Sequence, residues 1–96
     1  MFRDGRAAVR QQERSRVVIS GVDVNGVAFE EMTESRDISE EGLSFYLCRP
    51  IWINSHLTAE VSSKSNFGPS RITRIMVVRI QTDPSGKRLV AARFDE

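Results

Sequence analysis

Two short stretches of the chain carry side chains that could bind a ligand. In RQQER, Arg10 and Arg14 lie four residues apart, and guanidinium groups form strong charge-assisted hydrogen bonds with anions. In DISEEG, Asp37, Ser39 and Gly42 supply an acceptor, a hydroxyl and a position without a side chain. Each stretch alone has an ordinary explanation, because RxxxR occurs in many basic tails and Asp and Ser hydrogen-bond local amides in turns. Their meaning depends on the elements that position them.

Charge is distributed unevenly along the chain, although the net charge is only +1. Residues 1–16 contain five arginines and two acidic residues, a net charge of +3, whereas residues 17–96 contain nine basic and eleven acidic residues. A cationic arm therefore precedes a mildly acidic body. This asymmetry favours an anionic partner for the arm, with a solvated basic tail as the alternative.

Length and composition argue against several classes of protein. A chain of 96 residues, 40% of them hydrophobic, is typical of one small globular domain. It has no run of about 20 apolar residues and its N-terminus is charged where a signal peptide is apolar, so we expect a cytoplasmic protein without membrane insertion. The single cysteine, Cys48, cannot form an internal disulfide, and no metal-binding spacing is present. His56 has no serine and carboxylate at a revealing spacing, and the sequence contains no metal-ligand set and no phosphate-binding loop, so we expect no enzyme, metal or cofactor.

From residue 16 onward the pattern is typical of β-strands. Asn25-Gly26, between two runs rich in β-branched residues, predicts a hairpin with a type I′ turn, and DPSG at 83–86 predicts another turn. The later runs alternate apolar and polar residues, which predicts that these side chains face a core: Leu43, Phe45, Leu47, Leu57, Ala59, Val61, Val90, Ala92 and Phe94. Six such strands hide their edges best in a small antiparallel barrel over residues 16–96. Residues 1–15 lack a helix cap and an apolar stripe, and we expect a flexible arm there.

The order of the two stretches is more informative than either alone. RxxxR, then a strand and hairpin of about twenty residues, then DxSxxG at the start of the next strand, resembles the PilZ domain family. That resemblance implies an all-β fold, a six-stranded antiparallel split β-barrel that binds the bacterial second messenger cyclic di-GMP. It implies these ligand-binding residues: Arg10, Arg14, Asp37, Ser39 and Gly42. Arg36, beside Asp37, is a candidate addition to the site, with a cross-strand ion pair as its alternative role.

These residue types suit the ligand that the resemblance implies. A guanidinium group matches the O6 and N7 acceptors of guanine with two parallel hydrogen bonds, and it also stacks on a base or pairs with phosphate. The carboxylate of Asp37 accepts from the guanine N1–H and N2 amino donors. Ser39 reaches phosphate or base through its hydroxyl, and Gly42 allows a flat ligand to approach the backbone. Glu40 and Glu41, expected to be solvated turn residues, would repel a nearby phosphate.

Two features depart from the pattern of the family. Val9 occupies a position where many members carry a further arginine, which puts in doubt a binding mode that holds a stacked pair of ligands. A C-terminal helix often follows the barrel in the family, whereas this chain stops at 94–96, and we expect any signal to pass to a separate protein.

The sequence thus predicts a stand-alone cyclic di-GMP receptor in which ordering of the arm alters a partner-binding surface. One alternative is a PilZ-like protein–protein adaptor that does not bind nucleotide, against which the five intact motif residues argue. A second alternative, a small barrel that binds RNA or single-stranded DNA, is disfavoured by the acidic body and the lack of a run of exposed aromatic residues. We expect Trp52 to be a core or barrel-lid aromatic, with a partner-binding surface as its alternative role.

Overall fold

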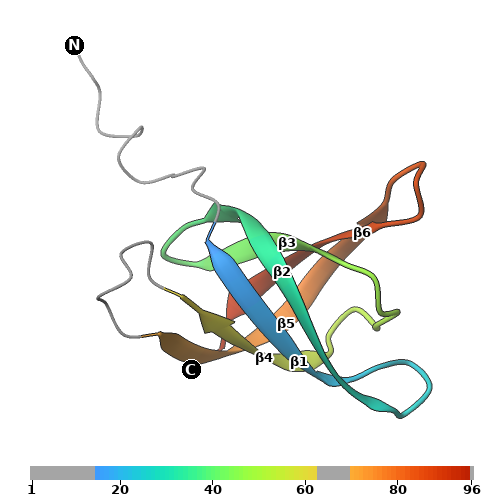
Figure 1. Cartoon of the computed structure of the whole chain (residues 1–96), viewed down its shortest axis with the longest axis horizontal. Coiled ribbons are helices and arrows are strands. Elements are labelled where there is room, and N and C mark those ends of the chain that lie inside the picture. Colours follow the sequence, from blue (N-terminus) through green and yellow to red (C-terminus); the bar gives the residue numbers. More distant parts are fainter. Residues whose placement is uncertain (1–14, 63–69, 96) are drawn as a thin grey trace.

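The computed structural model describes residues 15–62 and 70–95, which form six antiparallel strands (Figure 1). The strands are β1 (Arg16–Val22), β2 (Ala28–Ile38), β3 (Gly42–Leu47), β4 (His56–Val61), β5 (Arg71–Thr82) and β6 (Arg88–Phe94). These two ranges contain no helix, and therefore none that could cross a membrane. The predicted arm, residues 1–15, lies outside the described part except for Ser15, and so do Arg10 and Arg14.

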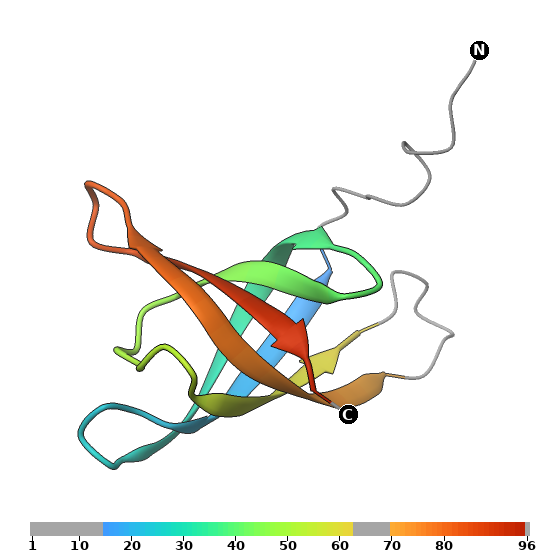
Figure 2. The same cartoon turned by 180° about the vertical axis from the view of Figure 1, so that it is seen from behind.

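The strands close into a barrel in the order β1-β2-β3-β6-β5-β4. Closure comes from β1 pairing with β4, in a ladder that runs from Val17 opposite Val61 to Ser20 opposite Thr58. β1 begins, β2 turns into β3, and β4 ends at the same end of the barrel, as the views from both sides show (Figures 1 and 2). The β1–β2 and β5–β6 turns lie at the opposite end. The expected all-β, six-stranded antiparallel barrel is confirmed.

The core of the barrel follows the period-two alternation of the strands. On β3, Leu43, Phe45 and Leu47 are buried while Ser44 and Tyr46 are half-buried on the outer face. The predicted core positions on β4 and β6 are also buried, apart from Val61 and Phe94, which pack against the core while only partly buried. Among the described residues, the buried core consists of Val17, Ile19, Phe29, Leu43, Phe45, Leu47, Ile51, Leu57, Ala59, Ile75, Val77, Val90 and Ala92. The closed sheet therefore buries the side chains of its inner face, and the side chains of its outer face remain available for binding.

Two of the hairpins use the same five-residue turn, and the type I′ prediction for Asn25-Gly26 is wrong. Gly26 has a φ of 78°, but Asn25 does not have a positive φ. Asp23 N–H donates to the Val27 carbonyl at 2.9 Å, and one carboxylate oxygen of Asp23 accepts from the amides of Asn25 and Val27. Asp83 repeats these contacts across the β5–β6 turn, where Gly86 has a φ of 92°. The aspartate carboxylate, rather than a second left-handed residue, stabilises each turn.

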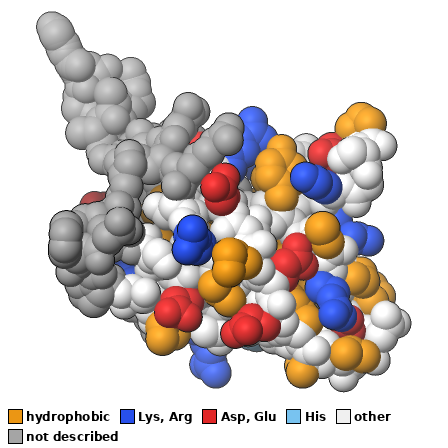
Figure 3. Space-filling model, viewed as in Figure 1, with side chains coloured by type: hydrophobic (Ala, Val, Ile, Leu, Met, Phe, Trp, Pro, Cys, Tyr) orange, Lys and Arg blue, Asp and Glu red, His pale blue; other side chains and the backbone are white. Residues whose placement is uncertain are grey.

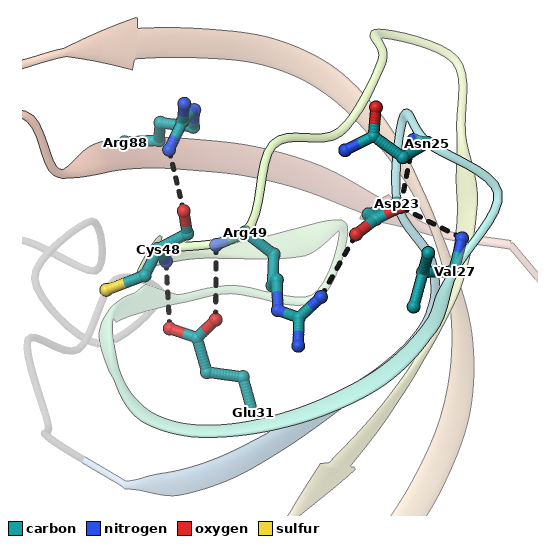
Figure 4. Close-up of polar contacts among 7 residues, drawn as sticks. All are labelled: Asp23, Asn25, Val27, Glu31, Cys48, Arg49 and Arg88. Carbon is teal, nitrogen blue, oxygen red and sulfur yellow. Dashed lines mark hydrogen bonds and ion pairs between the residues drawn. The ribbon is translucent and has the colours of Figure 1, made fainter.

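The segment between β3 and β4 crosses the end of the barrel that carries the β1–β2 turn, and polar contacts hold it there (Figure 4). The Glu31 carboxylate accepts from the amides of Cys48 and Arg49 at 2.8 and 3.2 Å, and Arg49 Nη1 donates to Asp23 Oδ2 at 3.0 Å. Trp52, in this segment, is 66% exposed, so the core or lid prediction is wrong. The core position here belongs to Ile51, which is buried.

Candidate functional site

The chain enters the barrel at Ser15, which is buried and fixed to β2. Ser35 N–H donates to the Ser15 carbonyl at 2.8 Å, and Ser15 N–H donates to Ser35 Oγ at 3.0 Å. Both serines are at most 8% exposed, so neither hydrogen bond competes strongly with water. The residue covalently attached to Ser15 is Arg14, the second arginine of RxxxR. The point at which the arm leaves the barrel is therefore beside Ser35, two residues before Asp37.

A β-bulge at Arg36 changes which side chains face outward at the end of β2. Ser35 pairs with Phe45 and Asp37 with Ser44, so that two residues of β2 correspond to one step on β3. Ser35 is buried, Arg36 is exposed, Asp37 is half-buried and Ile38 packs against the core. The extra residue thus turns two successive side chains, Arg36 and Asp37, to the outer face. No ion pair involves Arg36 in the described part of the chain, so its predicted cross-strand pair is absent there.

The carboxylate of Asp37 remains largely available. Ser44 Oγ donates to Asp37 Oδ2 at 3.4 Å, a long bond, and Oδ1 has no hydrogen-bond partner within residues 15–62 and 70–95. A carboxylate has room for about four hydrogen bonds. Asp37 can therefore accept further donors from outside the barrel.

Ser39 begins the tight turn between β2 and β3. Its N–H donates to the Gly42 carbonyl at 2.9 Å, and its Oγ accepts from Glu41 N–H at 3.2 Å. The Ser39 hydroxyl lies 3.5 Å from the Gly42 carbonyl, which is too long for a strong bond. Glu40 and Glu41 are exposed at the tip, as the sequence predicts. Ser39 thus shapes the turn with its oxygen while its proton can still reach another acceptor.

Gly42 has a structural requirement of its own. A Cβ on Gly42 would lie 2.0 Å from the Ala92 carbonyl oxygen and 3.0 Å from Arg93 Cα, both on the backbone of β6. Gly42 pairs directly with Arg93, and the next contact, Phe94 N–H to the Glu41 carbonyl, measures 2.9 Å. The absence of a side chain therefore lets β3 and β6 meet at the end of the barrel, whatever binds outside.

A pocket that the sequence did not predict lies on the outer face beside the bulge. It has a volume of about 330 Å³ and is lined by Glu34, Ser35, Arg36 and Tyr46. The alternation in LSFYL predicts that Tyr46 points away from the core. Only the pairing of β2 with β3 shows that it lies beside Glu34 and Arg36. The structure thus brings Arg36, Asp37, Ser39 and Gly42 together at one end of β2 and β3, with an aromatic pocket next to them.

The described surface of the barrel carries charges of both signs in the view of Figure 3. In the view of Figure 3, acidic and basic side chains are interspersed over the described part of the barrel, and no broad single-sign patch forms. The described residues also contain no cluster of three or more potential metal ligands. His56, considered above for catalysis, pairs with Asp95 at 3.0 Å, and both side chains are about half exposed. The carboxylate of Asp37 and the guanidinium of Arg36 therefore offer an acceptor and a donor side by side on the outer face.

Two solved structures share this barrel. Inhibitor of motility (MotI/DgrA) from Bacillus subtilis superposes with a TM-score of 0.72 and 24% identity, over 92% of this chain and 41% of that one. MrkH from K. pneumonia, in its apo state, gives a TM-score of 0.62 and 18% identity, over 99% of this chain and 44% of that one. This chain therefore spans less than half the length of either neighbour. No protein-family model and no curated protein matches the sequence. At these identities the likeness shows the fold, a PilZ-like barrel.

Proposed function

We propose that this PilZ-like barrel is a receptor for cyclic di-GMP, bound between the arginines of the arm and the outer corner at the end of β2. In this proposal Arg10 and Arg14 supply guanidinium groups for phosphate and guanine, and Asp37 and Ser39 supply an acceptor and a hydroxyl. Ordering of the arm over the barrel changes a surface that another protein reads.

The anchoring of Ser15 on Ser35 carries this proposal. Residue 14 is bonded to a residue whose amide and carbonyl are both held by Ser35. An arginine side chain reaches about two residue lengths of extended chain, or roughly 7 Å, which is the spacing from Ser35 to Asp37 along a strand. Arg14 therefore needs no rearrangement of the barrel to reach a ligand at Asp37. Arg10, four residues further from the anchor, has a longer reach and needs more ordering of the arm.

The outer corner at the end of β2, formed by Asp37 and Ser39, is better suited to bind guanine than phosphate. Asp37 retains an unpaired carboxylate oxygen in the described part, which suits the N1–H and N2 amino donors of guanine. Glu40 and Glu41 are exposed beside it and would repel phosphate. The phosphates of a bound ligand would therefore face the arm and Arg36. The role first assigned to Gly42, close approach of the ligand, is replaced in this proposal by pairing of β3 with β6.

A second function is favoured by one separate observation. Large apolar side chains are exposed near the end of the barrel remote from Ser15: Val22 54%, Val27 51%, Trp52 66% and Ile53 52%. The Val24 N–H to Pro50 carbonyl bond of 3.0 Å brings the β1–β2 turn and the Trp52 segment together. Exposed tryptophan is a favoured anchor in protein interfaces. This supports the PilZ-like adaptor, in which a protein partner binds here without any nucleotide.

Titration calorimetry with cyclic di-GMP tests the proposal, with GTP and a short single-stranded RNA as competing ligands. Arg10→Ala and Arg14→Ala should each weaken binding at least tenfold, about 1.4 kcal/mol, with little change in melting temperature. Arg6→Ala is the matched control, because it removes the same charge from the same arm outside the RxxxR spacing, and it should change affinity less than threefold.

Three results would contradict the receptor. Equal losses in the Arg6 and Arg14 variants would indicate simple charge attraction to the arm. Binding of RNA as tight as that of cyclic di-GMP, with strong salt dependence, would indicate a nucleic-acid-binding barrel. No binding of any nucleotide by the wild-type protein would leave the adaptor.

A further inference from the structure

We propose that the pocket lined by Glu34, Ser35, Arg36 and Tyr46 is a base-stacking subsite that takes a guanine ring of the ligand. The inference rests on the proposed function and extends it, because none of the three motif residues that the structure describes, Asp37, Ser39 and Gly42, lines this pocket. Tyr46 is the side chain on which the base would stack.

Strand pairing fixes the position of this pocket. Ser35 pairs with Phe45 on the antiparallel strand, so the adjacent residues Glu34 and Tyr46 lie opposite each other, and both are on the outer face. Arg36 lies two residues beyond Glu34, so strand alternation places both on the outer face. Ser35, which also lines the pocket, is the residue that holds Ser15. The chain leading to Arg14 therefore starts at the margin of the pocket.

The side chains of the pocket have the chemistry that guanine requires. Bases stack on aromatic rings, and tyrosine presents such a ring here in a half-buried position. A carboxylate accepts from the N1–H and N2 amino donors, and a guanidinium donates to O6 and N7 or to phosphate. In the described ranges the side chains of Glu34, Arg36 and Tyr46 make no hydrogen bond or ion pair with the protein. By contrast, the carboxylates of Asp23 and Glu31 are each occupied by at least two donors.

The size and position of the pocket suit one base of a dinucleotide. A volume of about 330 Å³ lies at the small end of ligand pockets, enough for one ring system. Because of the bulge, Asp37 lies opposite Ser44, two positions from Tyr46 on β3, so the corner and the pocket are about 7 Å apart along the strand. One ligand could therefore place one guanine in the pocket and the other at the Asp37–Ser39 corner, with its phosphates between them, next to Arg36 and the start of the arm.

Substitutions at Tyr46 separate stacking from general packing. Tyr46→Phe keeps the ring and should bind cyclic di-GMP within twofold of the wild type, whereas Tyr46→Leu should bind it about tenfold or more weakly. Trp52→Leu, which removes an exposed aromatic residue at the opposite end of the barrel, is the matched control and should leave affinity unchanged. Cyclic di-AMP, which lacks the guanine donor edge, should bind at least tenfold more weakly than cyclic di-GMP to the wild type.

A second measurement needs no variant. Tyr46 is the only tyrosine, so ¹³C-labelled tyrosine gives a single set of ring signals. These signals should move upfield during titration with cyclic di-GMP and saturate at the affinity found by calorimetry. Wild-type binding with unmoved ring signals and an unaffected Tyr46→Leu variant would overturn the subsite and leave the receptor intact. Absence of binding by the wild type would overturn the receptor, and the subsite with it.

Discussion

Replacing Gly42 by alanine should destabilise the barrel more than it disturbs any direct ligand contact. Gly42 lies opposite Arg93, and a Cβ there would stand 2.0 Å from the carbonyl oxygen of Ala92. Gly42 does not have a positive φ, so alanine introduces no backbone strain of its own. The whole cost comes from the collision with the backbone of β6, which no change of side-chain rotamer can relieve.

The size of the effect follows from that distance. Reaching an ordinary contact requires β3 and β6 to separate by about 1 Å or more at this point, which weakens the end of their ladder. Overpacking of this kind costs about 1–3 kcal/mol, and a rigid backbone neighbour favours the upper half of that range. For a domain of this size each kcal/mol lowers the melting temperature by roughly 4–8 °C. Gly42→Ala should therefore melt about 10–20 °C below the wild type.

Thermal melting followed by circular dichroism measures this, with Gly21→Ala as the matched control. Gly21 is also within a strand, but its added Cβ would meet the flexible Cδ2 of Leu57, at 2.5 Å, rather than backbone. We expect a loss of no more than about 1 kcal/mol there, since Leu57 can change rotamer. Equal melting temperatures for the two variants would refute the steric reasoning. If it holds, weak cyclic di-GMP binding by Gly42→Ala cannot be attributed to a lost ligand contact unless the variant is folded at the assay temperature.

Two further predictions concern the opposite end of the barrel. The pKa of Asp23 is lowered mainly by the Val27 amide, then by Asn25 and Arg49, against an opposing effect of burial, and the Ser85 hydroxyl, then the Lys87 and Ser85 amides, lower that of Asp83. Both carboxylates therefore stabilise the fold above their unfolded pKa of about 3.9 and lose this contribution as the pH falls through the lowered values. In a plot of melting temperature against pH, Asp23→Asn should flatten the decline on the acid side, whereas the exposed control Glu40→Gln should not. An unchanged decline in Asp23→Asn would contradict this. Glu31→Gln leaves one acceptor for the amides of Cys48 and Arg49, so hydrogen exchange at these amides should quicken several-fold. Glu30→Gln is the control and should leave the exchange unchanged. Unaltered exchange in Glu31→Gln would show that the carboxylate does not hold the Trp52 segment.

The barrel could be predicted from the sequence because its strands obey a period of two. Leu43, Phe45 and Leu47 point inward, and the polar residues between them point outward. The prediction of a type I′ turn from Asn25-Gly26 is wrong because it considers only these two residues. The carboxylate of Asp23 accepts hydrogen bonds from two amides of the turn and stabilises a different conformation. The related sequences DVNGV and DPSGK, which adopt the same turn, contain that signal.

Other parts of the site depend on contacts between strands that alternation cannot show. The bulge at Arg36 is a mismatch between β2 and β3, and it alone turns Arg36 and Asp37 to the same face. The clash that requires glycine at position 42 involves β6, fifty residues further along the chain. Trp52 was assigned to the core from its apolar neighbours, but hydrogen bonds to Glu31 hold its segment so that Ile51 is buried instead.

The closed barrel also limits how a ligand at one end can affect a partner. Each strand is hydrogen-bonded on both edges, and the core between the two ends is continuous. The packed core leaves little room for side chains to shift. If the proposed receptor is correct, ordering of an arm attached at Ser15 would add a new surface beside Ser35, whereas the exposed group around Trp52 lies at the opposite end of a closed barrel. Under that proposal, a partner that senses cyclic di-GMP is expected to bind at the Ser15 end of the barrel, and a partner that binds only at Trp52 is expected to bind equally well with and without the ligand.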